Sequence, residues 1–257
     1  MKAKRILPVV LAGAALIGTA LTTACSRAQR ATRLLERVDR HLAAGELAAA
    51  EIECRNLLQV DATHSGALRR LGVIYWDQGR ELRAVPVLRS ARDLDPDDAA
   101  ARIRLARFFL SCGDAGAARE EAVLVLRREP GNAEAPVILA TATAPDADAQ
   151  RRTRDILHAL PESASAPVLV ALGILDVRAG RAAAGEAAFH HALRADARLA
   201  AAHHALGMLR WGQRDLAGAA ASFRSAAEAA PRHSPYPLIH AGFLAQTGHA
   251  AEARHLM

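Results

Sequence analysis

Aromatic residues are scarce in this sequence: Phe, Trp and Tyr make up 4% of its 257 residues, although 51% are hydrophobic. Sheet proteins favour β-branched and aromatic side chains, whereas this chain is rich in Ala, which suits closely packed helices. Gly and Pro, with 17 and 11 residues, are too few for a low-complexity chain. The composition therefore predicts an all-α protein.

Lysine is nearly absent, and this changes the charge balance. Both lysines, Lys2 and Lys4, lie with Arg5 in a segment that we expect to be removed. Without these three residues, 30 basic residues face 27 acidic ones, and the formal charge of +6 falls to about +3. No dense basic stretch interleaved with aromatic residues occurs, so we expect no nucleic-acid partner.

Signatures of catalysis are also missing. No two of the 11 histidines are three or four residues apart, which is the spacing that a metal pair on a helix requires. The sequence has no Gly-rich phosphate loop, no G-x-S-x-G elbow and no Cys-x-x-Cys pair. We therefore predict no catalytic residue, no metal site and no cofactor.

The first 24 residues have the three parts of an export signal: a basic start, an apolar run over 6–21 and a small-residue stretch over 22–24. The apolar run is shorter than the roughly 20 residues of a membrane-spanning helix. We expect cleavage before Cys25, with residues 25–30 as a tether. The protein is therefore predicted to be exported.

Glycine recurs with a period of about 34 residues, at Gly45, Gly79, Gly113, Gly180 and Gly248, and Arg214 takes the equivalent place between the last two. The clearest copy of the repeat spans 65–98, with Leu68, Leu71, Gly72, Tyr75, Gly79, Ala84, Leu88, Ala91 and Pro96. This set recurs in 99–132, 166–199 and 200–233. In period and pattern the chain resembles the tetratricopeptide-repeat family.

The resemblance implies a right-handed superhelix of about six and a half helical hairpins. The predicted repeats span 31–64, 65–98, 99–132, 133–165, 166–199, 200–233 and, in part, 234–257. Each turn Gly should adopt the left-handed conformation that ends a first helix, and Gly or Ala after the Leu should let two helices approach closely. The repeat at 133–165 lacks the turn Gly, so we expect a distorted hairpin there.

The segment Leu21-Thr22-Thr23-Ala24-Cys25 resembles a bacterial lipoprotein signal. The resemblance implies lipidation of Cys25 and, with Ser26 after it, a periplasmic protein anchored in the outer membrane. Thr22 and Ala24 also suit an ordinary signal peptidase, which would release a soluble secreted product. The remaining cysteines, Cys54 and Cys112, lie on repeats that are not neighbours, so we expect small apolar fillers and no disulfide.

The inner wall of such an array is lined by the first helix of each hairpin. The residues expected to form this partner-binding groove are Leu35, Arg69, Val73, Trp76, Ile103, Arg107, Leu110, Val170, Ile174, Val177, Arg178, His204, Met208, Trp211 and Leu238. Both tryptophans fall at one repeat position. Such a groove suits a protein or peptide with apolar anchors and acidic groups. Burial of the tryptophans against a neighbouring repeat is the alternative interpretation.

The leader and the repeats together resemble bacterial tetratricopeptide lipoproteins, including those of exopolysaccharide and PEP-CTERM export loci; residues 48–53 and 56–58 contribute to this resemblance. It implies a non-catalytic scaffold of the cell envelope that binds protein or peptide partners. The alternative is an accessory protein of exopolysaccharide assembly or secretion, which binds carbohydrate through Trp76 and Trp211 or binds the secretion machinery. The lysine-dependent carboxylate clamp of some tetratricopeptide proteins is absent.

Overall fold

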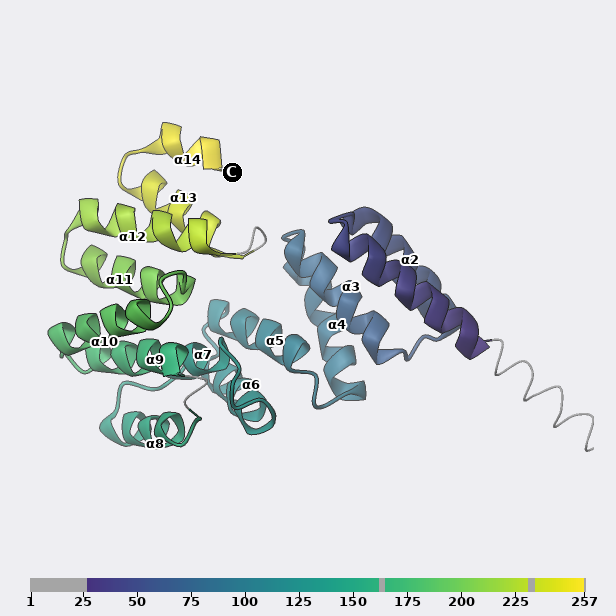
Figure 1. Cartoon of the computed structure of the whole chain (residues 1–257), viewed down its shortest axis with the longest axis horizontal. Helices are drawn as coiled ribbons and strands as arrows, with labels where there is room; N and C mark the ends of the chain where they lie inside the picture. Colours follow the sequence, from purple (N-terminus) through teal and green to yellow (C-terminus); the bar gives the residue numbers. More distant parts are fainter. Residues whose placement is uncertain (1–26, 162–164, 231–233, 257) are drawn as a thin grey trace, which may run out of the picture. The chain divides into compact units, whose positions relative to one another are not determined.

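The computed structural model describes residues 27–161, 165–230 and 234–256. Within these residues every regular element is an α-helix and no strand occurs, which confirms the predicted all-α class (Figure 1). None of the described helices is long and apolar enough to cross a membrane. Cys25 and the export signal lie outside the described residues.

The chain divides into two compact units. The first extends to Trp76 and includes Leu82–Pro96; the second consists of Asp77–Glu81 and the chain from Asp97 onward. The first unit contains helical residues 27–43, α2 (Leu47–Val60), α3 (Ser65–Asp77) and α4 (Glu81–Leu94). A core cluster joins three of these helices through Leu34, Leu57 and Ala67.

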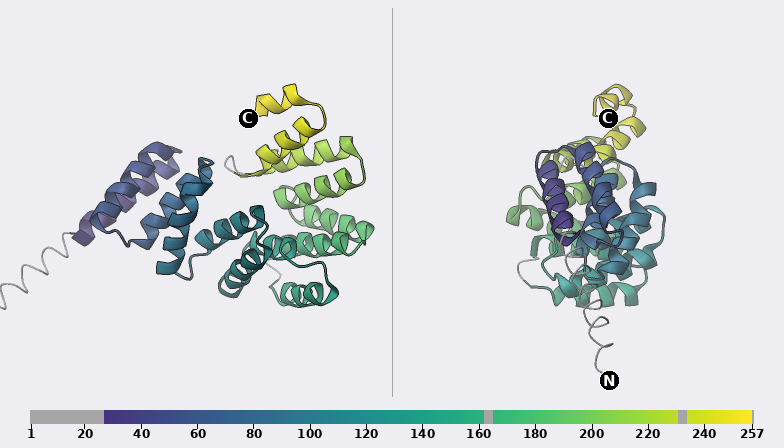
Figure 2. Two further views of the ribbon diagram at one scale, coloured as in Figure 1. Left: turned by 180° about the vertical axis from the view of Figure 1, so that it is seen from behind. Right: turned by 90° about the vertical axis from the view of Figure 1, so that its right-hand side faces the viewer.

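The second unit is a run of helical hairpins. Its helices are α5 (Ala99–Ser111), α6 (Ala115–Arg128), α7 (Ala135–Thr141), α8 (Ala147–His158), α9 (Ser165–Arg178), α10 (Ala182–Ala195), α11 (Ala200–Gly212), α12 (Leu216–Ala229), α13 (Tyr236–Gln246) and α14 (Ala250–Leu256). The first helices α7, α9 and α11 contact one another in succession, and each second helix also contacts the next hairpin, as α10 contacts α11 (Figure 2). Hairpins therefore stack through both helices, with the second helix of each hairpin packed on the first helix of the next.

The described helices fall in pairs along the chain, but the first helix begins at residue 27, before the predicted repeat, and α9 begins at Ser165, inside the preceding predicted range. The predicted tether was therefore wrong in part. Residues 27–30 belong to the first helix. The Arg27 Nε donates a hydrogen bond of 2.5 Å to the Val60 carbonyl at the end of α2. This bond satisfies one of the carbonyls that a helix terminus leaves free, which ties the start of the first helix to α2.

The turn between the helices of a hairpin is left-handed, as predicted. The five turn glycines have φ between 69° and 90°. Arg214 has φ of 65° at the equivalent place and is the one non-Gly residue with positive φ among those described. Side chains rarely adopt this conformation because the Cβ crowds the neighbouring carbonyl.

Close approach of the two helices depends on the Gly of the Leu-Gly pair, which also confirms a prediction. A Cβ placed on Gly72 would lie 2.6 Å from the Leu88 side chain, and one on Gly207 would lie 2.7 Å from the ring of Phe223. The same relation holds between Gly173 and Phe189, at 2.5 Å. Only a residue without a side chain leaves room for these buried side chains.

The hairpin over 133–165 is distorted, as predicted. Its first helix, α7, has 7 residues, about half the length of α5 or α9. No left-handed residue ends it. The turn is held by the Asp146 carboxylate, which accepts a hydrogen bond from the Ala149 amide, and by a buried 2.8 Å hydrogen bond between the Thr143 and Thr153 hydroxyls.

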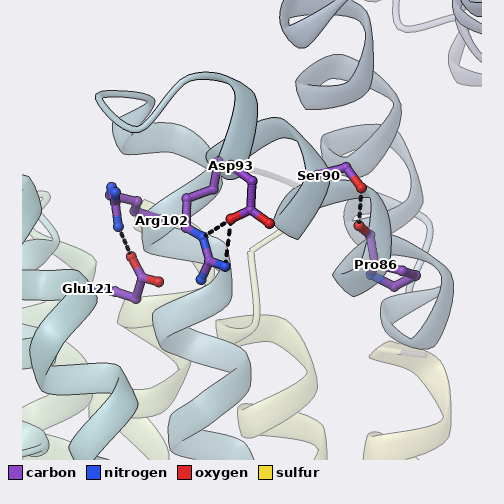
Figure 3. Close-up of polar contacts among 6 residues, drawn as sticks. Pro86, Ser90, Asp93, Arg102 and Glu121 are labelled. Atoms are coloured by element: carbon purple, nitrogen blue, oxygen red, sulfur yellow. Dashed lines mark hydrogen bonds and ion pairs between the residues drawn. The ribbon is translucent and has the colours of Figure 1, made fainter. Parts of the chain in front are cut away.

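Polar contacts reinforce single hairpins. Arg102 of α5 and Glu121 of α6 form a buried ion pair (Figure 3). Pro86 interrupts the hydrogen-bond ladder inside α4, because it has no amide hydrogen. Figure 3 also shows that the Ser90 hydroxyl donates to the Pro86 carbonyl, at 3.1 Å.

The two described cysteines differ in environment. Cys54 is fully buried, and burial raises the pKa of its thiol to about 12, so it behaves as the predicted apolar filler. Cys112 is exposed at the end of α5, so the same prediction was wrong for it. Both thiols are free.

Candidate partner-binding face

The predicted groove residues differ in how far their side chains are buried. Ile103 and Val170 are 4% and 0% exposed and belong to the core, so their prediction as accessible groove residues was wrong. They face the neighbouring hairpin because first helices pack side by side. Several others are partly buried against core clusters, namely Leu35, Leu110, Ile174 and Val177.

In the first unit, the predicted groove residues of α3 are half-buried. These are Arg69, Val73 and Trp76. Arg69 already takes part in a polar interaction. Trp76 therefore keeps part of its indole accessible in the first unit.

Trp211 is held inside an aromatic cluster. Its indole meets the rings of Phe223 and Phe243 edge to face, at centroid distances of 6.2 Å and 5.3 Å. Phe223 belongs to α12 of the same repeat, and Phe243 belongs to α13 of the next one. Trp211 thus packs against a neighbouring repeat, which was the alternative interpretation for the tryptophans.

His204 and Tyr236 link the same two repeats at a second place along α11. Their ring centroids are 5.5 Å apart, and His204 also lies 5.8 Å from Phe223. Burial lowers the pKa of His204 to about 4, so its imidazole is neutral near pH 7. Burial also raises the pKa of the Tyr236 hydroxyl.

Charged residues of earlier repeats shift the pKa of Tyr236 at this contact. The Arg107 guanidinium lowers the pKa of Tyr236 and the Glu134 carboxylate raises it, so both charges lie within electrostatic range of α13. Arg107 and Glu134 are themselves paired at 2.5 Å. Arg104, one turn before Arg107, is largely buried; burial lowers its pKa, and its Nε has no hydrogen-bond partner within the described residues.

Two large apolar side chains remain exposed on the first helices of the last two repeats. Met208 of α11 is 48% exposed and Leu238 of α13 is 65% exposed. Met208 follows His204 by four residues on α11, and Leu238 follows Tyr236 by two residues on α13. Arg178, also exposed, instead donates a 2.6 Å hydrogen bond to the Thr141 carbonyl at the end of α7. We name the surface formed by Met208, Leu238, His204, Tyr236 and the Arg107–Glu134 pair the inner face.

Sequence reasoning missed Tyr236, Glu134 and Arg104. Tyr236 stands at a repeat position that the groove pattern does not include, and Arg104 follows the predicted groove residue Ile103 on α5. Glu134 lies in the repeat that we expected to be distorted, from which no groove residue was predicted. Their roles depend on contacts between repeats, and the effect of Arg107 and Glu134 on Tyr236 joins repeats that are not neighbours in sequence. No group of His, Cys, Asp or Glu in the described part of the chain is arranged to hold a metal ion.

The family comparison decides what these hairpins are. Residues 76–135 match the family model for the tetratricopeptide repeat. The chain contains tetratricopeptide repeats. The matched stretch spans α4, α5 and α6, with parts of the repeats on either side. The remaining repeats show the same hairpin geometry, and most of them have left-handed turns.

Solved tetratricopeptide-repeat structures share the fold. A tetratricopeptide-repeat protein from Parabacteroides merdae ATCC 43184 is 15% identical, with a TM-score of 0.57 over 89% of this chain and 91% of that one. A thermophilic tetratricopeptide-repeat protein of Thermus thermophilus is 23% identical, with a TM-score of 0.51 over 70% and 98%. No curated protein gives a significant sequence match. These likenesses show a shared fold.

Proposed function

We propose that this tetratricopeptide-repeat protein is a non-catalytic scaffold of the cell envelope, which binds a protein or peptide on the inner face of its second unit. The observation that supports this most is the exposure of Met208 and Leu238 on adjacent first helices. Exposed apolar side chains beside aromatic and charged groups are typical of interface anchors and their rims. The Arg107–Glu134 pair at this face would orient polar groups of the partner.

The chemistry of the inner face favours peptide binding over catalysis. His204 is neutral and packed between two rings, and Arg107 is neutralised by Glu134. None of these groups is poised as a base next to a nucleophile, which acid–base or covalent catalysis requires. Apolar anchors with a few polar contacts suit an amphipathic segment.

Site-specific crosslinking tests the location. A photoreactive side chain at Met208 should crosslink a defined protein in the envelope fraction. Leu216 of α12 is the matched control, because it is also 48% exposed but lies on a second helix. A crosslink of equal yield from both positions, or none from Met208, would contradict the proposal for the inner face.

Export and anchoring are part of the same proposal and have a separate test. The leader over 1–24 and Cys25 support lipidation and placement in the outer membrane, facing the periplasm. Cells fed a labelled fatty acid should label the wild type and not Cys25→Ser. An unlabelled wild-type protein found in the medium would instead show a soluble secreted product.

The exopolysaccharide role would need an accessible tryptophan for stacking on sugar rings. Both tryptophans are half-buried, and Trp76, which is outside the aromatic cluster of Trp211, Phe223 and Phe243, is the residue to test first. Quenching of fluorescence by an acidic polysaccharide, lost in Trp76→Phe, would support that role over the peptide scaffold.

A further inference from the structure

The first helix and α2 enclose an arginine-lined hollow in the first unit. Its volume is about 550 Å³, and its wall contains Arg30, Arg33, Leu34, Arg37, Asn56, Gln59 and Val60. A second hollow of about 300 Å³ continues it and adds Arg27. None of the residues that line the two hollows is acidic.

Two of these arginines have no partner within the described residues. Arg30 and Arg33 are exposed and make no hydrogen bond or ion pair there. Other arginines of the same unit are committed: Arg37 pairs with Glu53, Arg70 with Asp39 and Arg92 with Asp93. The hollow therefore keeps at least two uncompensated positive charges after the Arg37–Glu53 pair is counted as neutral.

The other groups of the wall complement an anion with an apolar end. The side-chain amides of Asn56 and Gln59 can donate hydrogen bonds from α2, opposite the guanidinium groups. Leu34 and Val60 are largely or partly buried and form an apolar part of the wall. Arg binds phosphate through two parallel N–H groups, which favours a phosphate monoester or diester here.

We infer that this hollow, the arginine hollow, binds a phosphate group, and that the phosphate belongs to an anionic phospholipid headgroup. The hollow starts at residue 27, two residues after the cysteine proposed to carry the lipid anchor, so a membrane surface would lie within reach of Arg27, Arg30 and Arg33. Basic side chains near an anionic membrane surface strengthen binding to that surface. The choice of a phospholipid over a soluble phosphate rests on the proposed anchor at Cys25, and failure of the inference would leave the proposed inner face untouched.

Vesicle flotation tests this with residues 25–257 carrying Cys25→Ser, which retain every described residue and lack a lipid. We expect the protein to float with vesicles of phosphatidylcholine and phosphatidylglycerol but not of phosphatidylcholine alone. Arg30→Gln/Arg33→Gln should reduce the partition coefficient on the order of tenfold or more. The control Arg152→Gln/Arg194→Gln removes two exposed charges from α8 and α10 and should retain binding.

Inorganic phosphate distinguishes the two sources of the anion. If millimolar phosphate raises the Tm of the wild type but not of Arg30→Gln/Arg33→Gln, while vesicles are not bound, the ligand is a soluble phosphate compound. If both pairs of substitutions weaken vesicle binding equally, the effect is one of net charge and the arginine hollow is not a site. The same conclusion holds if neither vesicles nor phosphate bind, provided that far-UV circular dichroism shows the variants folded.

Discussion

The indole of Trp211 and the ring of Phe243 meet edge to face, with planes at 89° and centroids 5.3 Å apart. Because Trp211 ends the first helix of one repeat and Phe243 lies in the next, this contact joins two repeats. Phe223 completes the cluster, 5.0 Å from Phe243. In an array where each repeat contacts mainly its neighbours, stability depends on such interfaces.

Trp211→Ala should therefore destabilise the last two repeats. Truncation of a large, largely packed aromatic side chain costs about 3 kcal/mol. Urea unfolding followed by circular dichroism measures the change. Met208→Ala, three residues earlier and 48% exposed, is the control and should change stability by less than about 0.5 kcal/mol. Unchanged stability of Trp211→Ala with loss of a partner would make Trp211 a binding residue instead.

The packing of His204 makes stability depend on pH. Its pKa is about 4 in the folded chain, below its ordinary value of 6.5. Above pH 6.5 both states are neutral and stability is unaffected, whereas below it the unfolded state binds a proton that the folded state rejects. Stability therefore falls as the pH drops from about 6.5 toward 4, by about 3 kcal/mol.

Denaturant unfolding across this pH range tests the effect. His204→Gln should flatten the dependence, and the neighbouring His203→Gln should not. Burial also lowers the pKa of His240, so a smaller slope of the same sign remains in His204→Gln. Equal slopes in the wild type and His204→Gln would contradict a neutral, buried imidazole.

The parts predicted from sequence are those that depend on local backbone geometry. A left-handed turn favours Gly, so the recurrence of Gly every 34 residues predicted where each hairpin turns. The same period predicted the turn at Arg214, which adopts the left-handed conformation without being Gly. The burial of Ile103 and Val170 and the packing of Trp211 could not be predicted in this way. They depend on which side chains of the next repeat, such as Phe243, fill the space between helices.

Gly207 tests the close approach within a hairpin. Gly207→Ala should destabilise the protein by about 1–3 kcal/mol, because the new methyl group would overlap the ring of Phe223. Gly212→Ala in the same helix is the control, since a Cβ there meets nothing within 4 Å. Helix propensity predicts that this control raises stability by up to about 1 kcal/mol. Partial rescue of Gly207→Ala by Phe223→Leu would identify the ring as the cause.

Arg214 carries strain that its five equivalents avoid. A non-Gly residue in the left-handed region costs about 1–2 kcal/mol, and the exposed Arg214 side chain forms no ion pair or hydrogen bond with the described residues in return. Arg214→Gly should therefore raise the free energy of unfolding, by about 0.5–1 kcal/mol after the greater freedom of Gly in the unfolded chain is counted.

The neighbouring residue provides the control for Arg214→Gly. Gln213 has φ of −81°, which any residue adopts, so Gln213→Gly removes no strain and adds only unfolded-chain entropy. It should lower stability by roughly 0.5–1 kcal/mol. Thermal unfolding of both variants gives shifts of opposite sign if the left-handed turn is strained. Shifts of the same sign would mean that interactions of the arginine side chain offset the strain. Arg214 would then stabilise this turn as well as Gly does in the other repeats.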